Sequence, residues 1–321
     1  MINVQDLTRI YTRKLSNGWF RPATRLDHIA VDHLSFHIMP GERVAFIGPN
    51  GAGKTTTLRM LTGLLYPTSG MAQVAGYIPW KDRKKLAREI GIVFGQRSQL
   101  WAALPVIESF HSLRVIYDVP KAAFTARLDD LAQRLAIEDF LHQPARSLSL
   151  GQRMRCEIAA ALIHGPKVLF LDEPTIGLDV EAKAVLRDYL KTLNTANGTT
   201  IILTSHDTGD IEDICERVIM IDHGRKLMDQ PLQQLLQSFD TGRRIVITTE
   251  EKDPPCAGLE DMLAECASHR LTLNVDAQAI KLTQAMALVQ SQATITDIVI
   301  ERTPLETIIR RLYAQNGKET S

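Results

Sequence analysis

The residue types and spacing of a phosphate-binding loop, G-x-x-x-x-G-K-[ST], occur at Gly48-Pro49-Asn50-Gly51-Ala52-Gly53-Lys54-Thr55. The glycines let successive backbone N–H groups point into one concavity, and a following helix directs the positive end of its dipole at the same anion. Lys54 would reach the β- and γ-phosphates of a nucleotide, while the Thr55 hydroxyl would bind Mg²⁺. A plain glycine-rich turn is the alternative interpretation. The position directly between an apolar strand and a helical pattern favours the phosphate-binding loop.

Two carboxylates, Asp172 and Glu173, follow another apolar run and precede Pro174. A nucleotide site of this kind needs a carboxylate at the end of a neighbouring strand, and Asp172 is placed to join the Mg²⁺ shell. Glu173 could polarise the attacking water, a contribution worth about 10²–10⁴ in rate. Taken alone, such a segment is more often a simple turn. Together with the phosphate-binding loop it predicts the catalytic part of the same site.

The elements that must position these residues alternate between strands and helices. Five short apolar runs fit buried strands of a mostly parallel sheet: 44–47, 92–94, 168–171, 200–204 and 218–221. Segment 34–38 alternates like a half-buried strand, and residues 185–193 have a helical pattern that ends at Asn197-Gly198. Residues 105–142 contain no convincing strand and predict two or three helices, inserted as a lobe. The order favours an α/β layered fold.

The composition changes near Gln230-Pro231, where we predict a domain boundary. From residue 230 onward there are three more acidic than basic residues, although the whole chain is balanced with 37 of each. This tail predicts strands at 244–249, 271–275 and 296–301, and helices near 258–268, near 284–291 and after Thr303-Pro304. We therefore expect residues 1–229 to form the main domain and residues 230–321 a small α+β domain.

Length and composition limit the class of protein. At 321 residues, 23% charged and 45% hydrophobic, with a net charge of zero, the chain is unlike a strongly basic nucleic-acid binder or an acidic disordered chain. Its longest apolar run, Ile158 to Ile163, is far shorter than the ~20 residues of a membrane helix, and the start MINVQDLTRIY lacks a signal-peptide core. Cysteines at 156, 215, 256 and 266 form no CxxC pair, which predicts a reducing compartment and neither a metal nor a disulfide framework.

Further short motifs follow in a fixed order along the chain: Gln96 after a strand, Ser149-Leu150-Gly151-Gln152 before a helix, Gly177-Leu178-Asp179, and His206 after another strand. Alone, Ser149-x-x-Gln152 would be interpreted as a helix capping box, and His206 as an ordinary strand-end histidine. In this order they resemble the ATPase subunit of ATP-binding cassette (ABC) transporters over residues 2–229. Segments 76–80 and 95–101 are most similar to bacterial export systems, including viologen and drug exporters.

The resemblance implies a phosphate-loop nucleoside triphosphatase of the ABC ATPase type, with an inserted helical subdomain at about residues 97–155. It implies that Gln96 contacts the metal and the attacking water, and that His206 hydrogen-bonds the γ-phosphate. Thr56 would lie beside Thr55 in the nucleotide site. Tyr11, expected to follow a short strand, would stack on adenine. Trp19 or Phe20, within an apparent insertion at 13–27, is the alternative for that stacking role.

The resemblance also implies a second copy of the chain. Ser149, Gly151 and Gln152 would bind the γ-phosphate of ATP held by the other subunit, and Asp179 would cross the interface towards the opposite phosphate-binding loop. Leu150 stands where the family usually has glycine, but the contacting Ser149 and Gly151 are present. Two copies would sandwich two ATP molecules head to tail, as an isologous dimer requires.

The predicted function is an ATP-hydrolysing subunit that uses ATP and Mg²⁺ to power transport, in the export direction. Separate polytopic membrane subunits would contact residues 97–110, including Trp101, at the cytoplasmic face of the inner membrane, and no nucleic acid is expected as a partner. One alternative is a soluble ABC ATPase acting on ribosomes or DNA. The chain has one cassette, and only 53 positions separate Gln96 from Ser149, too few for a long coiled coil. An importer ATPase with a regulatory tail also remains, as does a regulator without turnover, against which Glu173 and His206 argue.

Overall fold

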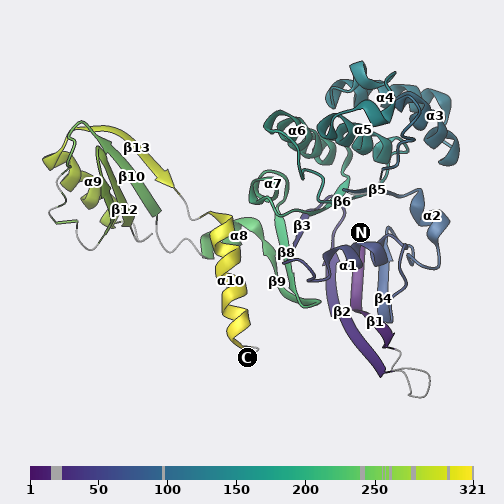
Figure 1. Ribbon diagram of the computed structural model, residues 1–321, viewed down its shortest axis with the longest axis horizontal. Coiled ribbons are helices and arrows are strands. Elements are labelled where there is room, and N and C mark those ends of the chain that lie inside the picture. The colour runs from purple at the N-terminus through teal and green to yellow at the C-terminus, as the bar shows by residue number, and fades with distance from the viewer. Residues whose placement is uncertain are drawn as a thin grey trace. The chain divides into compact units, whose positions relative to one another are not determined.

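The computed structural model describes residues 1–15, 24–95, 98–238, 243–254, 256, 258–259, 262–275, 280–301 and 304–319. The chain divides into two compact units, Met1–Leu232 and Gln233–Ser321, called unit 1 and unit 2 below (Figure 1). Within the described residues, no helix combines the length and apolar character needed to span a membrane.

The centre of unit 1 is a six-stranded sheet with the strand order β5-β6-β7-β3-β8-β9. Its strands are β3 (Arg43–Ile47), β5 (Ile90–Phe94), β6 (Val168–Asp172), β7 (Thr200–Thr204), β8 (Arg217–Asp222) and β9 (Arg225–Pro231). All pair in parallel except β9, which is antiparallel to β8. The predicted α/β fold is confirmed, since each of the five apolar runs forms one of the parallel strands.

Parallel pairing brings the carboxyl ends of β5, β6, β7 and β3 to one edge of the sheet. The partners are in register up to the last residues, with Asp172 opposite Phe94 on one side and Thr204 on the other. The described polar residues that the sequence singled out for chemistry at strand ends, Asp172, Glu173 and His206, lie at this edge. This edge is the expected place for a ligand in an open α/β sheet.

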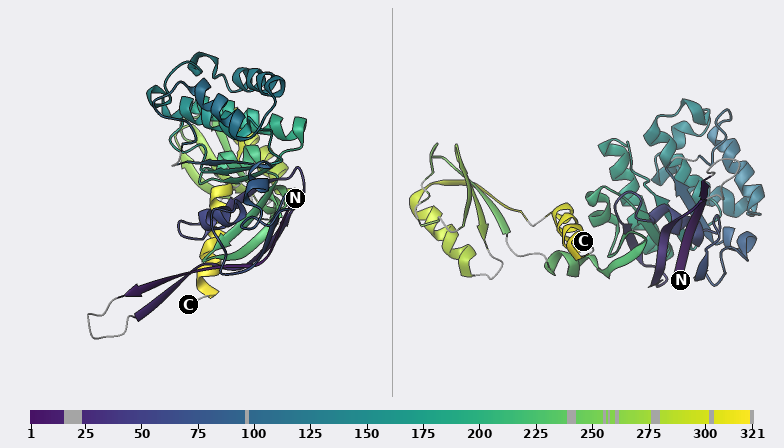
Figure 2. Two further views of the ribbon diagram at one scale, coloured as in Figure 1. Left: turned by 90° about the vertical axis from the view of Figure 1, so that its right-hand side faces the viewer. Right: turned by 60° about the horizontal axis from the view of Figure 1, so that its bottom comes forward.

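A second, antiparallel sheet in unit 1 has the order β2-β1-β4 and is built on a long hairpin (Figure 2). Its strands are β1 (Ile2–Leu15), β2 (Thr24–Ile38) and β4 (Ser69–Val74). The expectation that Tyr11 follows a short strand is wrong, because β1 continues past it and Tyr11 pairs with His28 of β2. The described parts of the apparent insertion, residues 13–15 and 24–27, therefore extend the hairpin. Trp19 and Phe20 lie outside the described residues.

Helices cover the six-stranded sheet and form a lobe beside it. They are α1 (Lys54–Leu61), α2 (Arg83–Ala87), α3 (Val106–Ile116), α4 (Lys121–Arg134), α5 (Leu150–Leu162), α6 (Val180–Asn197) and α7 (Thr208–Ile214), with 3-10 turns η1 (Glu138–Phe140) and η2 (Ala145–Ser147). Helices α3 and α4 and the turn η1 lie within residues 105–142, where the sequence predicted two or three helices. Helices α3 and α4 gather with α5 on one side of unit 1 (Figure 1). The lobe is linked to the sheet by the segments that follow β5 and precede β6.

The core of unit 1 joins its two sheets. Phe46 of β3 and Phe36 of β2 are buried with ring centroids 5.8 Å apart, and Phe170 of β6 is fully buried in the same cluster. Leu58 and Leu61 on α1 complete it from the helix that follows the phosphate-binding loop. Burial of this kind is the main favourable term in folding, at roughly 25 cal/mol per Å² of apolar surface. The packing therefore fixes α1, and with it the loop, against both sheets.

Unit 2 contains a four-stranded antiparallel sheet with the order β11-β12-β10-β13. Its elements are α8 (Leu232–Ser238, beginning at the boundary), β10 (Arg243–Thr249), β11 (Leu263–Ala267), β12 (Arg270–Val275), α9 (Ile280–Gln292), β13 (Ile295–Glu301) and α10 (Leu305–Glu319). Ile245, Leu271 and Leu273 of the sheet are fully buried, and Val289 of α9 packs against them.

The helix expected near 258–268 is wrong, because residues 263–267 form strand β11. Ala267 pairs with Arg270 across a two-residue turn, and His269 in that turn has φ 59°, in the left-handed region. The tertiary pairing of β11 with β12 thus overrides the local pattern that suggested a helix.

Candidate nucleotide site

A cleft of about 680 Å³ opens at the carboxyl edge of the six-stranded sheet in unit 1. Its walls come from the hairpin, the phosphate-binding loop, α1 and the ends of β5, β6 and β7. The lining residues are Tyr11, His28, Ala30, Pro49, Asn50, Gly51, Gly53, Lys54, Thr55, Thr56, Arg59, Leu64, Phe94, Gly95, Asp172, Glu173, Ile176 and His206. The volume is within the range of ordinary small-molecule sites.

The loop between β3 and α1 has a backbone that only glycine permits at its end. Gly53, the residue before α1, has φ 102°, and a Cβ placed there would lie 2.4 Å from the carbonyl oxygen of Ala30. Lys54 begins the helix, and its ammonium donates to the carbonyl of Gly48 at 2.6 Å. Burial lowers the pKa of Lys54, while the carboxylates of Glu173 and Asp172 act in the opposite direction. The result is a buried cation beside a close backbone turn at a helix N-terminus, which fits a phosphate group.

Asp172, the last residue of β6, faces two threonine hydroxyls. Thr55 Oγ1 donates to its Oδ2 at 3.2 Å, and Thr204 Oγ1 donates to its Oδ1 at 2.7 Å. Because Thr204 ends the neighbouring strand β7, the carboxylate is held from the sheet side and presented towards α1. Hydroxyl and carboxylate oxygens are the ligands that Mg²⁺ prefers, so Thr55 and Asp172 fit that ion.

Glu173 and His206 meet at the mouths of β6 and β7. The His206 Nε2 lies 3.2 Å from the Glu173 Oε1. Glu173 has φ 56°, and its backbone N–H points to the Thr204 carbonyl at 3.1 Å. Partial burial raises the pKa of the Glu173 carboxyl, and the nearby His206 and Lys54 oppose that shift. A carboxylate with a raised pKa is more basic, which suits it to accept a proton in the cleft.

Tyr11 lies at the far side of the cleft, on the hairpin. Its side chain is 38% exposed, and the guanidinium carbon of Arg9 lies 4.7 Å from its ring centroid. His28, directly opposite Tyr11 on β2, lines the same wall. His28 was missed in the sequence, because the register of a long hairpin is not visible in its residues. An aromatic ring and an imidazole side by side offer a flat surface for a base.

Ser149, Gly151, Gln152 and Asp179 do not line this cleft. The Ser149 Oγ accepts from the Gln152 N–H at 3.2 Å, and the Gln152 Oε1 accepts from the Ser149 N–H at 2.9 Å, so the capping box forms. Asp179 is likewise a helix cap, accepting from the Ala182 N–H at 2.7 Å. The role of Ser149 as a helix cap is compatible with the expected contact to a γ-phosphate. A hydroxyl oxygen that accepts one hydrogen bond still has its own proton to donate.

The cleft thus brings together the residues predicted at strand ends, with Gln96 outside the described residues. Tyr11, Lys54, Thr55, Asp172 and Glu173 share it, as do the remaining predicted residues Pro49, Asn50, Gly51, Gly53, Thr56 and His206. Gly48 and Ala52 belong to the same loop, where the Ala52 N–H donates to the Pro49 carbonyl at 3.1 Å. The sequence missed Thr204, whose hydroxyl holds Asp172, because a threonine inside an apolar strand carries no distinctive signal.

Comparison with known proteins agrees with this fold. A sequence model described as ABC transporter matches residues 31–176. The chain is 34% identical over 209 residues to the ABC transporter ATP-binding protein NatA of Bacillus subtilis, covering 65% of this chain and 85% of that protein. It is 38% identical over 213 residues to the Nod factor export ATP-binding protein I of Cupriavidus metallidurans, covering 66% of this chain and 69% of that protein.

Among solved structures, an ATP-binding cassette dimer in a post-hydrolysis state bound to ADP and Pi superposes with a TM-score of 0.62. It is 26% identical, and the match covers 72% of this chain and 99% of that one. The sheet and its cleft define the phosphate-loop class of nucleotide hydrolases. Within it, the chain belongs to the ATP-binding subunits of ABC transporters, and its activity is ATP hydrolysis coupled to transport.

Replacing Lys54 tests the phosphate contact. We expect Lys54→Ala to weaken ATP binding by about 10- to 100-fold, because a hydrogen bond to a charged group contributes about 1.5–3 kcal/mol. Isothermal calorimetry with ATP and the purified full chain measures this change. Lys85→Ala, on the exposed surface of α2, is the matched control and should bind ATP like the unchanged chain. Unchanged affinity in Lys54→Ala would contradict the assignment of the loop.

Proposed function

We propose that unit 1 binds ATP and Mg²⁺ in this cleft, that two copies close on two ATP molecules, and that the pair drives export through separate membrane subunits. The observation that carries the site assignment is the convergence of Lys54, Asp172, Glu173 and His206 at adjacent strand ends. Thr55 and Asp172 would hold the Mg²⁺, which supplies charge neutralisation at the phosphates when bound.

In this proposal Glu173 is the general base. Its carboxylate accepts the proton of the attacking water, and the raised pKa of the carboxyl favours that transfer. His206, 3.2 Å away, orients the carboxylate and donates towards the γ-phosphate. Lys54 binds the phosphates from the loop side. The role of Gln96, contact with the metal and the attacking water, is proposed from the family resemblance alone.

The proposed dimer is head to tail, and the capping box supports it. The Ser149 hydroxyl accepts from the backbone within its own chain, so its proton is available to a γ-phosphate held by the second copy. Gly151 and Gln152 begin the same helix, whose N-terminus favours an anion. Asp179 would approach the opposite phosphate-binding loop. These residues lie outside the cleft of their own subunit, as a shared site requires, and a related cassette was solved as a dimer.

The proposed membrane contact is the beginning of the helical lobe. Four large apolar side chains are exposed between residues 101 and 116: Trp101 at 42%, Leu104 at 43%, Val115 at 66% and Ile116 at 62%. Exposed apolar side chains gathered in one segment indicate an interaction surface. We propose that polytopic subunits contact this surface at the cytoplasmic face of the inner membrane. The name of the Nod factor export relative supports the export direction.

Removing the base separates binding from turnover. We expect Glu173→Gln to bind ATP with unchanged affinity, to lose turnover by about 10²–10⁴, and to accumulate as a dimer with ATP. Phosphate release and size-exclusion chromatography with ATP measure the two effects. Glu138→Gln, an exposed glutamate of η1, should behave like the unchanged chain. Full phosphate release by Glu173→Gln would refute the base assignment.

The membrane partner is tested by co-purification. Affinity purification of the full chain from detergent-solubilised membranes of its native cells should recover polytopic proteins. The double change Trp101→Ala and Leu104→Ala should reduce that recovery severalfold, since hot-spot side chains contribute at least about 1 kcal/mol each. Met71→Ala, an equally exposed apolar residue on β4, is the control. Recovery of ribosomes instead of membrane proteins would favour the alternative class of soluble ABC ATPases.

A further inference from the structure

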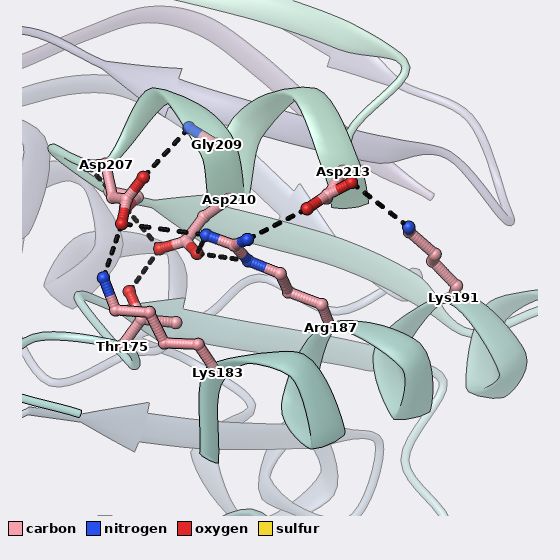
Figure 3. A network of polar contacts seen from close by, with 9 residues as sticks. Thr175, Lys183, Arg187, Lys191, Asp207, Gly209, Asp210 and Asp213 are labelled. Atoms are coloured by element: carbon pink, nitrogen blue, oxygen red, sulfur yellow. Dashed lines mark hydrogen bonds and ion pairs between the residues drawn. The ribbon is translucent and has the colours of Figure 1, made fainter. Parts of the chain in front are cut away.

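One buried carboxylate, Asp210 of α7, connects the two loops that carry Glu173 and His206 (Figure 3). Asp210 is 0% exposed. Its Oδ2 accepts from the Thr175 hydroxyl and, at 3.0 Å, from the Ser205 hydroxyl. Its Oδ1 accepts from the Arg187 guanidinium, with the Nε at 2.7 Å. The carboxylate is therefore saturated by donors from three separate segments.

The two hydroxyl donors to Asp210 come from the loops that carry Glu173 and His206. Thr175 lies two residues after Glu173, in the loop that follows β6. Ser205 directly precedes His206, in the loop that follows β7. A single oxygen of Asp210 thus receives hydrogen bonds from both loops. These two hydrogen bonds to Asp210 therefore fix the spacing of the loops, and with it the distance between the Glu173 and His206 side chains.

Arg187 of α6 supplies the charge that makes this burial possible. An isolated carboxylate transferred to an apolar interior is strongly destabilised, whereas a paired and fully hydrogen-bonded one is tolerated. Arg187 also reaches the exposed side, where one of its terminal nitrogens lies 3.0 Å from Asp213. Next to it, Lys183 pairs with Asp207 at 2.5 Å, and Asp207 caps α7 (Figure 3). Ion pairs therefore join helices α6 and α7 next to the loops that carry Glu173 and His206.

We propose that Asp210 is a positioning residue for ATP hydrolysis, and that it acts through Thr175 and Ser205 on the relative placement of Glu173 and His206. The inference rests on the proposed roles of Glu173 and His206. It adds that these two side chains are not placed independently. Removing either hydrogen bond to Asp210 should disturb the placement of Glu173 relative to His206.

The sharpest variant is Thr175→Val, which removes the hydroxyl and keeps the shape of the side chain. We expect kcat to fall about 10- to 100-fold with KM for ATP unchanged, because a misplacement of about 1 Å can cost 10²-fold. Thr175→Ser keeps the hydroxyl and should retain the rate. Asp210→Asn should lower kcat similarly. The kcat of the double variant, Thr175→Val with Asp210→Asn, should fall no further, since both changes interrupt the same connection between the two loops.

The control is Asp213→Asn, which removes another ion pair of Arg187 without touching either loop, and its kcat should stay unchanged. Multiplicative losses in the double variant, or equal losses in Thr175→Val and Thr175→Ser, would overturn the positioning role. Unchanged kcat in Thr175→Val, with turnover abolished in Glu173→Gln, would also overturn it and leave the proposed function intact. Persisting turnover in Glu173→Gln would instead refute the proposed function. Melting temperatures of all variants identify any loss caused by unfolding.

A separate observation concerns two cysteines of unit 2. The Sγ atoms of Cys256 and Cys266 lie 3.1 Å apart, one in the segment after Pro254 and the other on β11. Cys266 is exposed and Cys256 is partly exposed. By contrast, Cys156 and Cys215 are buried, and burial raises the pKa of Cys156 to about 12. Only the pair of Cys256 and Cys266 combines accessibility with sulfur atoms in direct contact.

We infer that Cys256 and Cys266 form a site for reversible disulfide formation with a low-molecular-weight disulfide as oxidant. The exposed Cys266 thiolate attacks one sulfur of oxidised glutathione, giving a mixed disulfide and one released glutathione thiol. The Cys256 thiolate then attacks Cys266 Sγ, forming the internal disulfide and releasing the second thiol. The protein loses two hydrogens, and the oxidant is reduced to two thiols. The sequence predicted no disulfide framework, whereas this inference places one reversible disulfide in unit 2.

Intact mass spectrometry of the full chain treated with oxidised glutathione tests the inference. We expect a loss of two hydrogens that dithiothreitol reverses. Neither Cys256→Ser nor Cys266→Ser should show it, whereas Cys156→Ala should. A stable glutathione adduct on the unchanged chain, a disulfide between two copies, or no reaction would each overturn the inference. Peptide mapping under non-reducing conditions assigns the bond to the two cysteines.

Discussion

The parallel pairing of β3, β6 and β7 is the constraint on which the rest of unit 1 depends. Parallel strands end at one edge, so residues separated by more than a hundred positions, such as Thr55 and Asp172, come within hydrogen-bonding distance. A parallel sheet is covered on both of its faces, so its strands are apolar on both sides, which explains the continuous apolar runs. Asp172, Glu173 and His206 lie one or two residues beyond such a run, and Lys54 follows the loop after β3. The chemistry and the core are therefore consequences of one arrangement of strands.

The sequence predicted the α/β class and the parallel strands because buried strands leave a continuous apolar signal. It also predicted which strand ends carry Lys54, Asp172, Glu173 and His206, because parallel order determines which ends meet. The hairpin was underestimated, since β1 continues through polar residues whose pairing with β2 is tertiary. The helix near 258–268 was wrong for a related reason: β11 depends on its partner β12 and not on its own pattern. Local signals fail where the partner strand decides the structure.

The polar residues that support the site were the least visible in the sequence. Thr204, Thr175 and Asp210 look like ordinary residues of a strand, a turn and a short helix. Their importance comes from distances between segments, such as the 2.7 Å from Thr204 to Asp172. Glu173 and His206 are set apart by motif, whereas the residues that hold them are set apart only by geometry. Residues recognised by motif therefore form the site only together with supporting residues that carry no motif.

The capping box at Ser149 has a consequence for the energetics of subunit association. Because Ser149 and Gln152 already satisfy each other's backbone N–H groups, the start of α5 is ordered in the single subunit. Immobilising a flexible segment at an interface costs conformational entropy, about 0.5–1.5 kcal/mol for each ordered side chain. A surface that is rigid before contact avoids that cost. In the dimer proposed above, the affinity of one subunit for the other would then depend mainly on the nucleotide between them, and cleavage of that nucleotide would release them.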